Sequence, residues 1–97
     1  MTNEEIWNIG LEERTDELSK LQSEYDRLDV ECRKAEFEKD MYARLRDVNN
    51  AMLYKQKFSE KYEKCARASE KLRKQKKALE DEIGVLKKEI YYINSLM

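Results

Sequence analysis

Apolar side chains recur at alternating steps of three and four residues along two long parts of this chain. In residues 11–35 the first heptad position is held by Leu11, Leu18, Tyr25 and Cys32, and the fourth by Arg14, Leu21, Leu28 and Ala35. The spacing returns from residue 58 onward, with Tyr62, Ser69, Lys76, Ile83, Ile90 and Met97 at the first position and Phe58, Cys65, Leu72, Leu79, Leu86 and Ile93 at the fourth. Such spacing places one apolar seam along a helix. Because exposing that seam to water is costly, the helix needs a partner.

The composition favours a long helix over a globular fold. Charged residues make up 42% of the 97 residues, and there are two Gly and no Pro. An all-β domain would need turns marked by Gly and Pro, and a doubly wound domain would need strands richer in Val. We therefore predict an all-α chain: a single long helix that forms a two-stranded coiled coil. Residues 1–10 form an N-terminal cap segment, and residues 11–97 form the rod.

The seam predicts a homodimer, and parallel strands are favoured. Ile at the first position with Leu at the fourth is typical of parallel dimers, and a Lys at a first position can reach out of a two-stranded seam. The predicted dimer seam comprises Leu11, Leu18, Leu21, Tyr25, Leu28, Cys32, Leu72, Lys76, Leu79, Ile83, Leu86, Ile90 and Ile93.

The charge distribution keeps two other arrangements open. Residues 1–40 carry a net charge of −7, residues 41–77 carry +8, and residues 78–97 carry −2. A parallel pair stacks like charges, whereas an antiparallel dimer lays the acidic part along the basic part. A hairpin that turns at Asn49-Asn50 would fold residues 11–48 onto 51–97, acid on base, and would bring Cys32 near Cys65.

Three clusters outside the regular seam are candidate partner-binding residues. Ile6, Trp7 and Ile9 follow a helix start at Thr2-Asn3-Glu4-Glu5, where Thr2 can cap the helix. Residues 37–58 have an irregular register with bulky side chains, which either bind another helix or form a joint in the rod. The candidates are Ile6, Trp7, Ile9, Phe37, Met41, Tyr42, Leu45, Tyr91 and Tyr92.

A basic run supports an alternative function. Residues 71–77 contain five cations, Lys71, Arg73, Lys74, Lys76 and Lys77. Such a run can bind nucleic acid or act as a nuclear-import signal, although it is also typical of the solvated flank of a coiled coil. Because Leu72 and Lys76 lie on the seam, we expect nucleic-acid binding to be the weaker interpretation.

Catalysis, cofactors and metals find little support. There is no His, no Gly-rich phosphate loop, and Cys32 and Cys65 do not have metal-ligand spacing. No apolar run is long enough to cross a membrane, and the N-terminus lacks the pattern of a secretory signal. The composition resembles that of the coiled-coil rods of cytoskeletal, centrosomal and motor-associated proteins. We expect a non-enzymatic, cytoplasmic scaffold that dimerises a larger protein or spaces two partner-binding ends, with a nuclear adaptor as the alternative.

Overall fold

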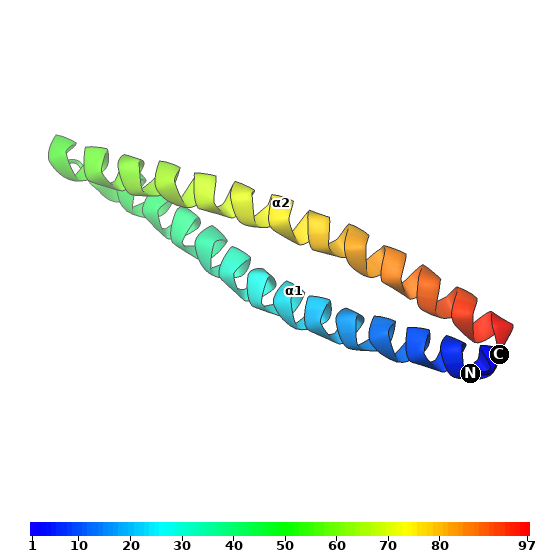
Figure 1. Ribbon diagram of the computed structural model, residues 1–97. Coiled ribbons are helices and arrows are strands. Elements are labelled where there is room, and N and C mark those ends of the chain that lie inside the picture. The colour runs from blue at the N-terminus through cyan, green and yellow to red at the C-terminus, as the bar shows by residue number, and fades with distance from the viewer. The chain divides into compact units, whose positions relative to one another are not determined.

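The chain forms two long α-helices and no strands. The computed structural model describes all residues 1–97, with α1 at Asn3–Val48 and α2 at Met52–Leu96 (Figure 1). The backbone amide of Glu5 donates a hydrogen bond of 3.2 Å to Oγ1 of Thr2, so Thr2 caps α1 as the sequence predicted. The all-α prediction is confirmed.

The favoured prediction of one uninterrupted helix is not what the structure contains. Asn49, Asn50 and Ala51 lie outside both helices, at the place of the hairpin alternative. Asn side chains compete with helical backbone hydrogen bonds, which makes this pair a suitable point of interruption. The break lets the two seams cover each other within one chain, so no second chain is required to take the first seam out of water.

The turn unit comprises Leu28–Lys76, which includes the break and the helical residues on either side of it. Here the two helices lie antiparallel. Glu36 on α1 contacts Arg73 on α2, and Glu38, which is nearer the turn, contacts Cys65, which is also nearer the turn. The rings of Tyr42 and Phe58 stack with centroids 6.2 Å apart.

The terminal unit comprises Met1–Arg27 and Lys77–Met97. It is also an antiparallel helix pair, in which Tyr25 hydrogen-bonds to Glu80 and Arg14 to Glu89. Trp7 and Leu96 border the same groove, so the two ends of the chain lie close to each other.

Burial along the hairpin is greatest in the turn unit. Leu28, Cys32, Ala35 and Ser69 are buried there. Three of these four side chains, those of Cys32, Ala35 and Ser69, are small. The remaining predicted seam residues are half-buried, since a single facing helix covers only one side of each.

The observed register lays acid on base in the turn unit, where Asp29 faces Lys76 and Glu36 faces Arg73, but not in the terminal unit, where both facing segments are net negative. The acidic segment 1–27 belongs to the terminal unit and faces 77–97, whereas the basic segment 52–76 belongs to the turn unit and faces 28–48. Each unit therefore keeps a net charge of its own. The terminal unit has 12 acids and 6 bases, for a charge of −6, and the turn unit has 14 bases and 9 acids, for a charge of +5.

Candidate interaction surfaces

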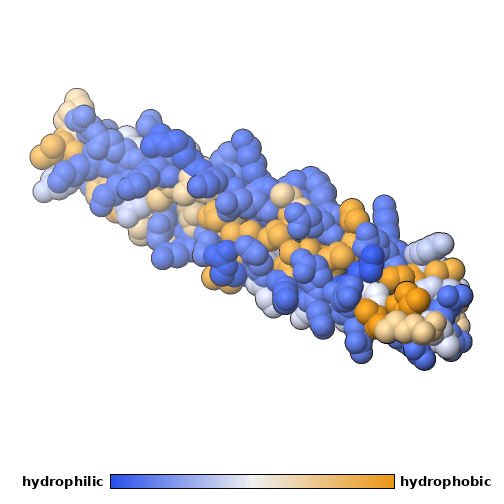
Figure 2. Space-filling model, in the orientation of Figure 1, coloured by the Kyte–Doolittle hydropathy of each residue, from blue (hydrophilic) through white to orange (hydrophobic).

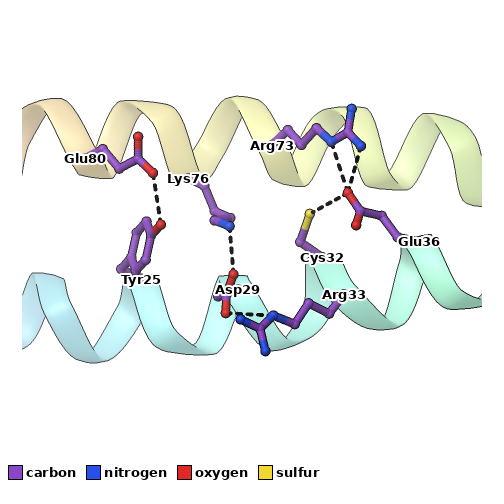
Figure 3. A network of polar contacts seen from close by, with 8 residues as sticks. All are labelled: Tyr25, Asp29, Cys32, Arg33, Glu36, Arg73, Lys76 and Glu80. Atoms are coloured by element: carbon purple, nitrogen blue, oxygen red, sulfur yellow. Dashed lines mark hydrogen bonds and ion pairs between the residues drawn. The ribbon is translucent and has the colours of Figure 1, made fainter.

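A polar layer lies across the helix seam of the turn unit. Nζ of Lys76 donates a hydrogen bond of 2.7 Å to Oδ1 of Asp29, and Arg33 holds the second oxygen of the same carboxylate at 3.2 Å (Figure 3). The side chains of Asp29 and Lys76 are only 26% and 21% exposed. Lys76 therefore remains at its predicted seam position, but a carboxylate of its own chain neutralises it.

A second ion pair lies closer to the break, seven residues further along α1 and three residues earlier on α2. Both Nε and Nη2 of Arg73 donate to Oε1 of Glu36, at 3.1 and 2.8 Å. The thiol of Cys32 donates to the same carboxylate oxygen at 3.8 Å. This arrangement gives Glu36 three donors from both helices (Figure 3).

These contacts shift the pKa values of the groups involved. The hydrogen bond from Lys76 holds the pKa of Asp29 below its ordinary value, and the hydrogen bond from Arg73 does the same for Glu36. The same pairing raises the pKa of Arg73. Burial, and then the negative charge of Glu38, raise the pKa of the Cys65 thiol, which donates to Glu38 at 3.9 Å.

The basic run at 71–77 is divided by this pairing. Arg73 and Lys76 are held by carboxylates of α1, whereas Lys71, Lys74 and Lys77 are exposed. Fewer cations of this run are therefore unpaired, and available to bind nucleic acid, than the sequence suggests.

The predicted partner-binding residues differ in how far the hairpin covers them. Tyr42 is half-buried, stacks on Phe58 and lies under Nζ of Lys61 at 5.4 Å, so the hairpin itself uses this ring. Trp7, Met41 and Leu45 are also half-buried. The side chains that remain exposed are those of Ile6, Ile9, Phe37, Tyr91 and Tyr92.

Two apolar grooves accompany these side chains. In the turn unit, Phe37, Met41 and Leu45 line a groove along α1 together with Asp40 and Arg44. In the terminal unit, a groove with mainly apolar walls is lined by Trp7, Arg14, Lys88, Glu89, Tyr92, Ile93 and Leu96. Hydrophobic patches are visible between hydrophilic side chains on the face shown in Figure 2.

Sequence reasoning missed several exposed apolar side chains on the outer faces. Val30 and Val85 are 66% and 57% exposed, yet neither was a candidate. The signal that could have found Val30 is its spacing of seven residues from Phe37, which puts both on the side of α1 opposite the seam.

No metal site or membrane span is evident in the two helices. No group of three or more His, Cys, Asp and Glu side chains is positioned to hold a metal ion, and both cysteines are free thiols. Neither helix contains a stretch apolar enough, over enough residues, to span a bilayer.

Comparison of this chain with protein-family models, with curated proteins and with solved structures finds no match. The function must therefore be argued from the surfaces that the two helices present.

Proposed function

We propose that this chain is a helical-hairpin assembly module that joins copies of itself and uses its outer faces and chain ends to hold or space other proteins. One observation carries the proposal. After the hairpin has closed, fourteen large hydrophobic side chains remain exposed, while only Leu28, Cys32 and Ala35 form a buried apolar core. No catalytic activity is part of this proposal.

The geometry of two helices explains this imbalance. Each helix offers one face to the other, so an apolar side chain on the opposite face stays in water until another surface covers it. Contiguous exposed apolar patches on a small protein mark interaction sites. On α1, the exposed residues Val30 and Phe37 lie two helical turns apart on such a face. These outer faces are what a binding partner would cover.

Self-association of the full chain tests the proposal. Sedimentation equilibrium in physiological salt is expected to show a reversible assembly of two or more copies at micromolar concentration. A protein that stays monomeric up to ~100 μM would contradict self-association, since weaker binding than this is worth less than about 6 kcal/mol. The cytoskeletal or motor-associated setting stays a prediction that this measurement does not address.

A nuclear or nucleic-acid adaptor is the second candidate. The observation that favours it is the row of exposed cations on α2, where Lys64, Arg67, Lys71 and Lys74 recur at steps of three and four residues. Binding through phosphates should weaken steeply with salt, because counterions are released. Fluorescence anisotropy with a labelled duplex at low salt tests this candidate, and the absence of measurable binding would exclude it.

A further inference from the structure

Large hydrophobic side chains gather at the break between the two helices. Val48 is the last residue of α1, and Met52, Leu53 and Tyr54 are the first three of α2. Their exposed fractions lie between 53% and 80%, so residues 48–54 hold four of the fourteen exposed large hydrophobic side chains of the chain. We call these four residues the tip, because the two helices meet there at one end of the turn unit (Figure 1).

The tip residues surround the beginning of α2 and do not form a stripe along one of its sides. Successive residues of an α-helix point about 100° apart around its axis, so Met52, Leu53 and Tyr54 together cover about 200° of the circumference. A partner helix packed along α2 would cover only side chains spaced three and four residues apart. A flat apolar phase that meets the end of the hairpin covers all three side chains at once.

Cations lie directly beside the tip on both helices. Residues 44–58 contain four bases and one acid, for a net charge of +3, and residues 48–59 contain no acid in a chain that has 21. The acid, Asp47, pairs with Arg46 at 3.3 Å. The other three bases are exposed, and the hairpin gives none of them an ion pair. These free cations are Arg44, Lys55 and Lys57.

The apolar and the cationic side chains follow one another along the helix axes. At 1.5 Å per residue, Tyr54 lies about 3 Å from the first residue of α2, while Lys57 lies about 8 Å from it. On α1, Arg44 lies about 6 Å before Val48. Amphipathic segments at a membrane surface bury apolar side chains about 5–10 Å deep, and basic side chains beside them meet anionic headgroups. The layers of the tip match these depths.

We propose that the tip inserts end-on into the surface of an anionic lipid bilayer, with Arg44, Lys55 and Lys57 against the negatively charged headgroups. The contact is peripheral, because only the last turn of α1 and the first turn of α2 enter the boundary between headgroups and acyl chains. The inference goes beyond the proposed function, since it gives the end of the hairpin a partner that is neither a second copy nor another protein.

Charge and shape favour a bilayer over the other occupants of the tip. Contact between the tips of two copies would set a net charge of +3 against another of +3. A nucleic acid would neutralise the cations but would leave the four apolar side chains in water. An anionic bilayer supplies both a negative surface and an apolar phase beneath it, and each Lys or Arg near such a surface strengthens binding.

Co-sedimentation of the full chain with vesicles tests the inference. The protein is expected to bind vesicles of equal parts phosphatidylcholine and phosphatidylserine about tenfold or more tightly than vesicles of phosphatidylcholine alone. Met52→Ser/Leu53→Ser removes apolar groups from the tip and should weaken this binding about tenfold or more. Val85→Ser/Tyr91→Ser makes the same kind of change at exposed sites of the terminal unit, and it should bind within about threefold of the unsubstituted protein.

A second pair of variants tests the cations. Lys55→Gln/Lys57→Gln should weaken binding to the phosphatidylserine vesicles about tenfold. Lys71→Gln/Lys74→Gln removes the same charge from exposed sites of α2 about 30 Å from its beginning, which is beyond the screening length of about 8 Å at physiological salt. This control should therefore bind within about threefold of the unsubstituted protein. Far-UV circular dichroism on every sample checks that the helices remain intact.

Fluorescence reports whether the tip enters the apolar phase. Trp7 is the only Trp of the chain and lies in the terminal unit. In Trp7→Phe/Leu53→Trp the indole lies in the tip, so its emission should move to shorter wavelength when phosphatidylserine vesicles are added, and lipids brominated on their acyl chains should quench it. The emission of Trp7 in the unsubstituted protein should show neither effect.

Three results would overturn the inference. They are a lack of binding to the phosphatidylserine vesicles, equal binding by Met52→Ser/Leu53→Ser and the unsubstituted protein, and an unshifted emission of Trp7→Phe/Leu53→Trp on the vesicles. If the serine variant instead loses self-association and keeps vesicle binding, the tip contacts a second copy and the inference is also overturned. Sedimentation equilibrium without lipid tests the proposed function separately, so failure of either proposal can be told from failure of the other.

Discussion

The ammonium group of Lys76 on α2 and the carboxylate of Asp29 on α1 form a hydrogen bond of 2.7 Å across the seam of the turn unit. Both side chains are largely covered, so each charge depends on the other for much of its solvation. The pair fixes one register among the several that an apolar seam would tolerate.

Substitutions of Asp29 and Lys76 should therefore have strongly coupled effects on the free energy of unfolding. Asp29→Asn and Lys76→Gln are each expected to lower the urea midpoint of unfolding, because each leaves a partly covered charge without its main partner. The double variant should lose less stability than the two single losses added together, and the reversed pair Asp29→Lys/Lys76→Asp should recover part of it. Additive losses in the double-mutant cycle would contradict the pairing.

Acid should destabilise the hairpin through two carboxylates. The pKa values of Asp29 and Glu36 are lowered in the folded chain by hydrogen bonds from Lys76 and Arg73. A lowered folded pKa gives stability that is present above the unfolded pKa and is lost as the pH falls through the folded pKa. The melting temperature should be constant near neutral pH. It should fall as the pH drops from the ordinary carboxyl pKa toward the lower pKa values of the folded chain. In Asp29→Asn/Glu36→Gln, this fall should be smaller.

Truncation of the core should be much more costly than truncation of the surface. Leu28 is 5% exposed, so Leu28→Ala is expected to lower the free energy of unfolding by about 2–5 kcal/mol. Leu53→Ala, at an exposed site, should change it by less than about 0.5 kcal/mol. Equal effects of the two substitutions in chemical denaturation would argue against the observed seam.

Removal of one hydroxyl should stabilise the chain. Ser69 is buried, and its Oγ has no hydrogen-bond partner. A buried polar group without a partner costs about 1–3 kcal/mol, so Ser69→Ala is expected to raise the urea midpoint. Ser59→Ala, at a half-buried site near the turn, serves as a comparison. A lower midpoint for Ser69→Ala would show that the hydroxyl makes a favourable contact.

The thiol of Cys65 should react slowly with alkylating reagents. Its pKa is raised by burial and by Glu38, and only the thiolate is nucleophilic. In Cys32→Ala, iodoacetamide should modify the remaining thiol more slowly than it modifies the same chain in urea. Adding Glu38→Gln removes the repelling charge and should speed the reaction of the folded chain. No acceleration would contradict the contact between Glu38 and Cys65.

The heptad spacing was sufficient to identify the faces that become covered. Leu28 and Cys32 were predicted seam residues and are buried, and Leu79 and Ile83 are half-buried on the matching face. The spacing could not identify what covers them. Two seams of the same period pair equally well within one chain or between two, and only the interruption at Asn49-Asn50 decides between these possibilities.

The register of the two helices could not be predicted from the net charges of the segments. Net charges counted by halves predicted that a hairpin would lay acidic residues on basic ones, and the pairs Asp29 with Lys76 and Glu36 with Arg73 do so in the turn unit, but the totals could not identify these particular partners. Exposed charges at larger distances are screened by salt and contribute little to this choice. The exposed side chains of Val30 and Val85 were missed because these residues were judged against the seam alone.

The closeness of the two chain ends has a consequence for how the molecule can be rebuilt. Trp7 and Leu96 share a groove, so a short flexible linker could connect residue 97 to residue 1. With a new opening between Asn49 and Ala51, the result would be a circular permutant in which the former loop supplies both termini. The two helices should still pair when α2 precedes α1 in the chain, because their contacts do not depend on which ends are joined.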